Sequence, residues 1–328
     1  MRRVSLNITN KCNLGCFHCF NRNNNLCNNE LNKYDLFNLI DQMKEINCDY
    51  LAIGGGEPLM RDDLFEILSY AKKQSINPSI VTNCLLVTKD IAKLFNQLKL
   101  RKIKVSIDGV GKVYEQIRDG SSFDELVKKI KILRKHFTGH IQASITLSTA
   151  NLNDYKNIIE LADNLNLDSV RIAPIMPLGR ALKNTDLLLS QDQFINFIKD
   201  VRRIKTNIDL DLPDKNRLYD KNKSFGCHCG KETCWVLNNG DFYSCIFFGE
   251  DYKIGNIKNE RLASLISKSK KSVSFSGNET CKNCSSYEKC RAGCRARALY
   301  KYNDINAVDP FCLLKKNETN ISNINNTL

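Results

Sequence analysis

Short apolar segments alternate with amphipathic ones along the first half of the chain. Apolar and β-branched residues are concentrated in six short segments, at residues 4–8, 50–53, 79–82, 104–107, 142–146 and 169–173. The stretches between them have the spacing of amphipathic helices. Short, continuously apolar strands separated by helices are typical of a parallel sheet that is covered on both faces. The pattern predicts an α/β fold, with a parallel sheet and outer helices, up to about residue 177.

Three of the predicted helices begin with a recognisable cap. A polar residue is followed three positions later by Glu or Gln, as in a capping box, at Asp63 with Glu66, Ser122 with Glu125, and Ser190 with Gln193. The last pair precedes a strongly periodic run, which predicts a helix over residues 191–204. This helix would connect the sheet to the C-terminal part of the chain.

The chain changes character after that helix. Periodicity disappears over residues 225–316, where nine of the fifteen cysteines occur. Such a segment needs a partly inorganic core to fold. We therefore predict a core domain with its connecting helix at residues 1–212 and a cysteine-rich domain at 213–316. The Asn-rich residues 317–328 are predicted to be a disordered tail.

Composition places the chain among ordinary globular proteins. Its 328 residues, of which 42% are hydrophobic, can bury a substantial core. The start has no apolar run suited to a signal peptide, and no run of about 18 apolar residues occurs anywhere. We therefore expect a cytoplasmic protein without membrane contact. Reducing conditions keep thiols free there, so the spaced cysteines indicate metal binding rather than disulfides.

The basic charge balance does not by itself indicate nucleic-acid binding. The formal net charge is +13, and metal-bound thiolates would lower it to about +8. Lys and Arg are scattered without a block of five or more like charges, which is typical of solvated helical faces. We expect no nucleic-acid partner, although a non-catalytic metal protein that binds nucleic acid is an alternative of a different class. An acidic peptide would also suit this charge.

The first cysteines lie directly after the first predicted strand. Cys12, Cys16 and Cys19 have the spacing CX3CX2C. Three thiolates leave one iron of a cubane cluster open to a small molecule, whereas four would close the cluster. The same triplet could instead complete a zinc site with a distant fourth ligand.

Two further motifs lie directly after predicted strands. Gly54 precedes the sequence GGEP, which comprises Gly55, Gly56, Glu57 and Pro58. Glycine lets a backbone approach a ligand closely, although an ordinary Gly-rich turn is the alternative. The sequence VSIDG at residues 105–109 is followed by IRDG at 117–120. Parallel α/β sheets and barrels bind ligands at this end of their strands.

Together these motifs resemble, in their order and spacing, the signature of the radical S-adenosylmethionine (SAM) superfamily. The resemblance implies a partial (β/α)6 TIM-type barrel and a 4Fe-4S cluster held by Cys12, Cys16 and Cys19. SAM would bind the open iron and be cleaved reductively to a 5′-deoxyadenosyl radical. The implied SAM-binding residues are Gly54, Gly55, Gly56, Glu57, Pro58, Ser106 near the ribose or carboxylate, and His18 against the adenine.

The second group of cysteines also has a specific spacing. Cys229 is followed by ten residues, Gly240, four residues and Cys245; CX2CX5CX3C and a distant cysteine come later. Two structural zinc sites could use such spacings. The spacing resembles the seven-cysteine SPASM extension of radical SAM enzymes. That resemblance implies two closed auxiliary 4Fe-4S clusters, the first held by Cys229, Cys234, Cys245 and Cys294, and the second by Cys281, Cys284, Cys290 and Cys312.

Four cysteines are left outside these sets. Cys48 and Cys84 lie close to predicted strands and are expected to be small buried apolar residues. Cys27 falls in a polar loop. Cys227 could be an alternate ligand or a hydrogen-atom donor, and a spare thiol is the simpler interpretation.

The resemblance also indicates a substrate class. SPASM proteins act mostly on peptides and proteins, so we expect a maturase that abstracts hydrogen from a ribosomally synthesised peptide to make a thioether, a carbon–carbon crosslink or an epimer. Its partners would be a precursor peptide and a reductant such as ferredoxin or flavodoxin. A sulfatase-type maturase is an alternative, but Ile246 stands where such enzymes have an Asp after Cys245. An enzyme of cofactor biosynthesis is the other alternative.

Overall fold

The computed structural model describes residues 2–21, 29–213, 227–272 and 278–313. One ten-stranded sheet runs through these residues, with the spatial order β10-β9-β8-β1-β2-β3-β4-β5-β6-β7. The strands are β1 (Arg3–Asn7), β2 (Tyr50–Gly54), β3 (Asn77–Thr82), β4 (Lys102–Ser106), β5 (His140–Leu147), β6 (Ser169–Pro174), β7 (Asp209–Asp211), β8 (Thr233–Val236), β9 (Asp241–Tyr243) and β10 (Lys253–Asn256).

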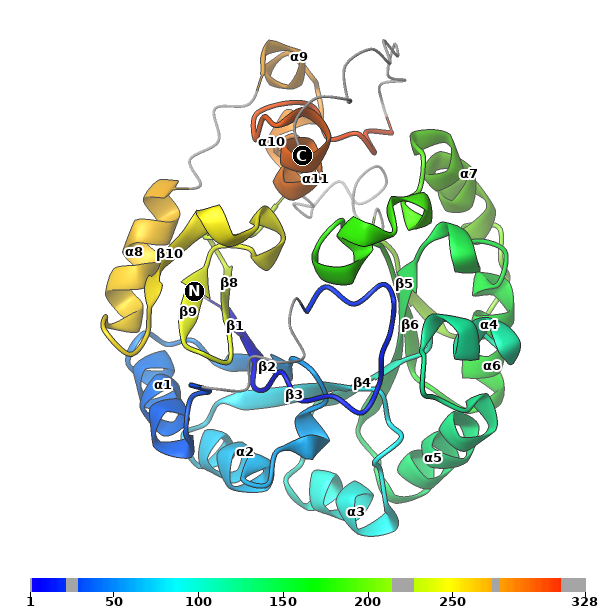
Figure 1. Cartoon of the computed structure of the whole chain (residues 1–328), viewed down its shortest axis with the longest axis vertical. Coiled ribbons are helices and arrows are strands. Elements are labelled where there is room, and N and C mark those ends of the chain that lie inside the picture. The colour runs from blue at the N-terminus through cyan, green and yellow to red at the C-terminus, as the bar shows by residue number, and fades with distance from the viewer. Residues whose placement is uncertain (1, 22–28, 214–226, 273–277, 314–328) are drawn as a thin grey trace.

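The strands β1 to β7 are all parallel to their neighbours. They curve around a common interior with helices on the outside (Figure 1). Within the described residues the sheet ends at β10 on one side and β7 on the other, so the barrel is incomplete. The predicted partial barrel with six strand–helix units is confirmed.

The helices mostly cover the outer face of the sheet (Figure 1). Their bounds are α1 (Lys33–Glu45), α2 (Leu64–Lys73), α3 (Lys89–Gln97), α4 (Lys112–Ile117), α5 (Phe123–His136), α6 (Tyr155–Asn164), α7 (Gln191–Val201), α8 (Leu262–Ser272), α9 (Glu279–Lys282), α10 (Tyr287–Cys290) and α11 (Arg295–Tyr302). Short 3-10 turns are η1 (Pro58–Met60), η2 (Thr149–Asn151), η3 (Gly179–Lys183), η4 (Thr185–Leu187), η5 (Ile246–Phe248) and η6 (Glu250–Tyr252). No helix among the described residues is long and apolar enough to span a membrane.

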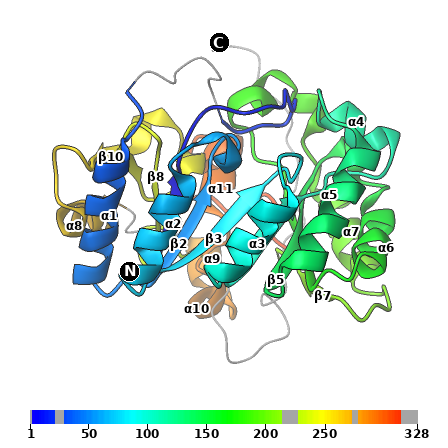
Figure 2. The same cartoon turned by 90° about the horizontal axis from the view of Figure 1, so that it is seen from below.

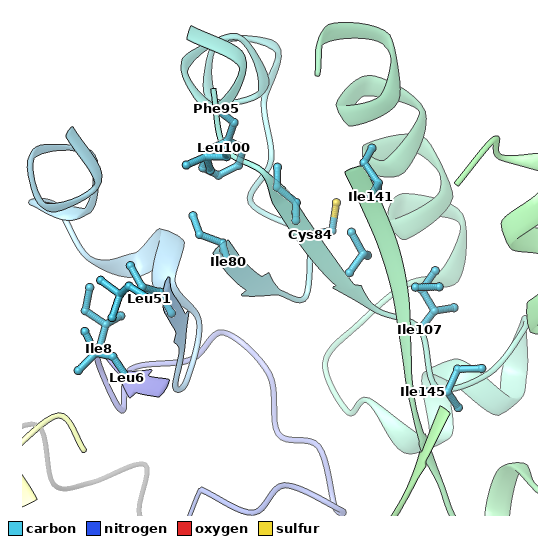
Figure 3. Packing of buried hydrophobic residues seen from close by; sticks show 14 of the residues in the cluster. Leu6, Ile8, Leu51, Ile80, Cys84, Phe95, Leu100, Ile107, Ile141 and Ile145 are labelled. Carbon is cyan, nitrogen blue, oxygen red and sulfur yellow. The ribbon is translucent and has the colours of Figure 1, made fainter. Parts of the chain in front are cut away.

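The main core lies between the sheet and its outer helices. Leu6, Leu51, Ile80 and Ile141 come from four different strands and pack in this layer (Figure 3). Alternate residues of a strand point to opposite faces, so a second row of side chains faces the barrel interior instead. Cys48 and Cys84 are both fully buried in the core. The prediction that these two cysteines are small buried residues is confirmed.

Two of the predicted helix caps form and one does not. Ser190 and Gln193 make a full capping box at the start of α7, and the Ser122 hydroxyl accepts from the backbone N–H of Glu125. Asp63 makes no capping hydrogen bond. Its carboxylate instead binds the side chain of Arg61, with N–O distances of 2.6 and 3.0 Å. A nearby cation thus competes successfully for the carboxylate that would cap α2.

The sheet continues across the predicted domain boundary. β8, from the cysteine-rich segment, pairs in parallel with β1, and β8 and β9 form an antiparallel hairpin. Gly240 lies in this turn with φ of +92°, which glycine adopts without strain. Figure 2 shows the loop after β1 at one end of the parallel strands and α9 and α10 towards the other end. Cys27 and the predicted tail lie outside the described residues.

Candidate active site and metal centres

The three N-terminal cysteines share one loop after β1, residues 12–19, which we call the cysteine loop. Cys16 is buried, whereas Cys12 and Cys19 are half-buried. The three thiols lie within electrostatic range of one another. Burial raises the pKa of Cys16 to about 11. Iron binding to these thiols would therefore be coupled to the release of protons.

Two neighbouring segments hold the cysteine loop through its backbone. On one side, the backbone N–H of Gly15 donates to Asp119 O at 2.9 Å. On the other side, the backbone N–H of Arg180 donates to Cys19 O at 2.9 Å, and its guanidinium donates to Cys16 O at 2.8 Å. Backbone carbonyls that would otherwise lose water are thereby paired.

The GGEP segment contacts the same stretch of chain. The backbone N–H of Gly56 donates to Thr9 O at 2.7 Å, and that of Glu57 donates to Lys11 O at 2.8 Å. A Cβ atom on Gly56 would lie 2.1 Å from Lys11 O, and one on Gly55, whose φ is +129°, would lie 2.5 Å from Thr9 O. The chain's own backbone therefore requires glycine at both positions, independently of any ligand.

Glu57 is fully buried and occupied by internal hydrogen bonds. Its carboxylate accepts from the Thr82 hydroxyl at 2.8 Å and from the backbone N–H groups of Asn83 and Leu59 at 2.8 and 3.1 Å. Burial raises the pKa of Glu57. Pro58 is buried in η1, directly after it. Both residues shape the loop that the family resemblance predicts to border SAM.

The cysteine-rich segment also reaches this site. The Glu30 carboxylate accepts from the Thr9 hydroxyl at 3.0 Å and the Asn10 backbone N–H at 2.7 Å, just ahead of the cysteine loop. It also accepts from the side-chain amide of Asn238, in the β8–β9 turn, at 3.1 Å. The start of the cysteine loop is thus connected to a residue more than 200 positions later.

His18 points to a buried carboxylate. Its Nε2 lies 3.2 Å from Asp108 Oδ2, and Asp108 also binds the guanidinium of Arg118 at 2.6 Å. Burial would raise the pKa of Asp108, but the charge of Arg118 and the contact with His18 outweigh it and hold the pKa well below its ordinary value. His18 therefore has a partner within the protein, in addition to the predicted role against adenine.

Two of these residues received no role from sequence reasoning. Asp108 belongs to VSIDG and Arg118 to IRDG, so the motifs contained the signal but not the pairing of the two. Ser106 ends β4 opposite Ser144 of β5 and is half-buried. It lies two residues before Asp108, which places it at the same end of the sheet as the cysteine loop.

The structure brings together a first group of cysteines in the C-terminal segment, and Cys227 belongs to it. The side chain of Cys227 interacts with that of Cys229, which in turn interacts with that of Cys245. Cys229 and Cys294 pack with Cys245 in one small apolar cluster. Cys227 also lies within electrostatic range of Cys294.

Cys234 lies elsewhere. It is fully buried in the main core, opposite Val4 of β1, and its Sγ is 4.0 Å from Arg3 O. Among the other thiols, that of Cys48 contributes most to raising the pKa of Cys234. Because Cys234 lies within β8 and faces the outer helices, the structure does not bring it to the ligands predicted for the first auxiliary cluster.

A second group contains the remaining cysteines. Cys281 is buried, and Cys284, Cys290 and Cys312 all lie within electrostatic range of it. Asp309 connects this group to the first one. Its carboxylate accepts from the backbone N–H of Cys294 at 2.7 Å and its carbonyl from that of Cys312 at 2.9 Å.

The donor sets suit iron–sulfur clusters. Among the described residues, no three Cys, His, Asp or Glu side chains are arranged to hold a single metal ion. A cubane makes a different demand, because each thiolate binds its own iron atom. The number and type of cysteines suit such clusters: there are three thiols in one loop and two groups of four in the C-terminal segment.

Two family models match the chain. Residues 6–162 match the radical SAM superfamily, and residues 227–295 match the SPASM iron–sulfur cluster-binding domain. Together they span more than half of the chain. Mycofactocin maturase MftC of Mycobacterium tuberculosis is 25% identical, with 93% of this chain and 81% of the relative covered. AdoMet-dependent heme synthase of Methanosarcina barkeri is also 25% identical, with 96% of this chain and 97% of the relative covered.

Solved structures share the fold. The Streptococcus suis protein SuiB, bound to its precursor peptide SuiA, superposes with a TM-score of 0.75 at 17% identity. The superposition covers 94% of this chain and 74% of SuiB. At that identity the likeness concerns the fold alone. With both family models matched and the cysteines in place, the chain belongs to the radical SAM superfamily as an enzyme with a C-terminal SPASM domain, whose cofactors are SAM and 4Fe-4S clusters.

Proposed function

We propose that this enzyme generates a 5′-deoxyadenosyl radical at the cysteine loop and uses it to abstract hydrogen from a ribosomally synthesised peptide. Cys12, Cys16 and Cys19 hold the SAM-binding cluster, which supplies the electron for SAM cleavage. The observation that carries this is the fixed cysteine loop, whose three thiols would leave one iron of a cubane without a protein ligand. GGEP, Ser106 and His18 surround the same end of the sheet.

The auxiliary clusters take the two C-terminal groups as ligands. The first is held by Cys227, Cys229, Cys245 and Cys294, and the second by Cys281, Cys284, Cys290 and Cys312. Cys227 replaces the predicted Cys234, because its thiol contacts Cys229 whereas Cys234 lies in the core. We place the division between the two domains near residue 212, and the enzyme in the cytoplasm with ferredoxin or flavodoxin as its reductant.

A peptide substrate is favoured by the relatives. SuiB binds a precursor peptide, and MftC is a maturase. A sulfatase-type reaction is disfavoured by Ile246, which is buried against Leu178 and Tyr243 and offers no base. The heme synthase relative supports cofactor assembly as the second candidate.

Anaerobic reconstitution tests the catalytic part. We expect about twelve irons per chain and 5′-deoxyadenosine on addition of SAM and dithionite. Replacing Cys12, Cys16 and Cys19 by Ala removes about a third of the iron and all 5′-deoxyadenosine. Turnover that survives the triple replacement would refute the site. Mass spectrometry with a short peptide encoded beside the gene, against an iron porphyrin precursor, then separates the two substrate classes.

A further inference from the structure

Arg118 is a buried cation directed at one of the cluster ligands. It is only 7% exposed. Its Nη1 donates to the Sγ of Cys16 at 3.8 Å, within the range of hydrogen bonds to sulfur. The adjoining backbone holds the cysteine loop, since Gly15 N–H donates to Asp119 O. The guanidinium and the loop therefore keep a fixed relation to each other.

Asp108 fixes the guanidinium for this contact. Arg118 Nε and Nη2 both bind Asp108 Oδ2, at 2.8 and 2.6 Å. The second oxygen of Asp108 accepts from the backbone N–H of Thr146 at 2.7 Å, and its backbone carbonyl accepts from Asn151 at 2.9 Å. The carboxylate thus occupies two donors of Arg118 and leaves Nη1 for the sulfur. Lysine could not serve both partners, because it lacks this planar fork.

A hydrogen bond from a cation to cluster sulfur favours the reduced cluster. Reduction adds negative charge, which is shared by the thiolate ligands, and hydrogen bonds to sulfur are among the factors that set the potential of iron–sulfur clusters. Burial strengthens such a contact, because little solvent screens it. Among the hydrogen bonds of the described residues, the guanidinium of Arg118 reaches the thiol of Cys16, while its charge also acts on the thiol of Cys12.

We propose that Arg118 is a positioning residue of the SAM-binding cluster, which raises the reduction potential of that cluster through its hydrogen bond to Cys16 while Asp108 holds it in place. The inference rests on the proposed ligation of iron by Cys16. It assigns IRDG a role in electron uptake, beyond shaping a turn.

The test is a redox titration of the reconstituted holoenzyme. The SAM-binding cluster is recognised as the one whose reduced EPR signal changes when SAM is added. The double variant Arg118→Met/Asp108→Asn removes both charges, so that no buried carboxylate is left unpaired. We expect iron content to stay at the wild-type level and reduction of this cluster to become roughly tenfold less favourable, a shift of about 59 mV to lower potential for one electron.

A matched control and a conservative variant complete the design. Arg134→Met/Asp168→Asn removes another Arg–Asp pair, joined at 2.9 Å between α5 and the segment before β6, and should leave this potential unchanged. Arg118→Lys should fall between wild type and the double variant. An unchanged potential in the iron-replete double variant overturns the proposal but not the function. Loss of the SAM-binding cluster from both Arg118 variants also overturns it, because Arg118 would then be needed only for assembly. If Cys16→Ala retains that cluster, the proposed function itself fails.

Discussion

The cysteine loop and the C-terminal cysteine groups are organised in different ways. The loop has all three proposed ligands within eight consecutive residues, and hydrogen bonds with GGEP, residues 117–119 and Arg180 hold its backbone and flanks. The C-terminal groups collect their proposed ligands from residues 227 to 312, partly on the four-residue helices α9 and α10. Protein contacts preorganise the first site, whereas we expect the second region to depend more on its metal for cohesion.

Removal of iron is expected to give the largest difference in behaviour between the two regions. A chelator that strips all clusters should leave the barrel strands protected from hydrogen exchange, while residues 278–313 lose protection almost completely. Exchange followed by mass spectrometry measures both regions in one sample, and the reconstituted protein is the control. Equal loss of protection in β2–β5 would contradict the difference between the two regions.

Substitution within GGEP tests how firmly the cysteine loop is held. Gly56→Ala places a Cβ atom 2.1 Å from Lys11 O, so we expect a loss of about 4 kcal/mol of stability and of iron from the SAM-binding cluster. Gly54→Ala is the matched control, because its Cβ would meet only Val81 at 3.8 Å. Thermal unfolding and iron analysis measure the effects. Equal behaviour of the two variants would show that the loop yields to the added methyl group.

Two cysteines of the C-terminal segment give contrasting expectations. Cys227→Ala should remove up to about a third of the iron, because one auxiliary cluster loses a ligand. Cys234→Ala should retain all iron and lower stability by about 1 kcal/mol through lost core packing. Iron content and the visible absorption of both variants decide between them. Iron loss confined to Cys234→Ala would restore the ligand set that the resemblance to the SPASM extension implied.

A smaller effect is expected inside the barrel, where no metal is involved. Burial, with the charges of Arg171 and Arg3, lowers the pKa of Lys104 from 10.5 to about 7. Between these values the unfolded chain binds more protons, so stability rises with pH across this window. Lys104→Met should therefore stabilise the protein by about 2 kcal/mol below pH 7, and the gain should vanish near pH 10.5. Unfolding temperatures at pH 6.5 and 9 measure this; a gain independent of pH would contradict it.

The sequence allowed good prediction where one local pattern decides the structure. All six predicted strands appear within three residues of their expected bounds. Short parallel strands that are buried on both faces are nearly continuous runs of apolar residues, which are easy to find in a sequence. The CX3CX2C cysteines lie together in one loop, as their spacing predicts. Sequence reasoning assigned the glycines of GGEP to SAM binding. The structure adds a second requirement for glycine, because the carbonyls of Thr9 and Lys11 lie against Gly55 and Gly56.

Contacts between distant segments were beyond prediction. The pairing of β8 with β1 joins residues about 230 positions apart, and it directs the side chain of Cys234 into the core. No spacing rule states which face of a strand a cysteine occupies until the partner strand is known. The same holds for Arg118, whose bonds to Asp108 and Cys16 depend on the approach of three loops.

The position of β1 between β2 and β8 has a consequence for biosynthesis. One neighbour is made soon after β1, but the other leaves the ribosome only after some 230 further residues. At 5–20 residues per second, that delay is roughly 10–45 seconds. During this interval the nascent chain presents one open edge of its first strand, a state prone to aggregation. The contact of Asn238 with Glu30, just ahead of the cysteine loop, can form only after this interval.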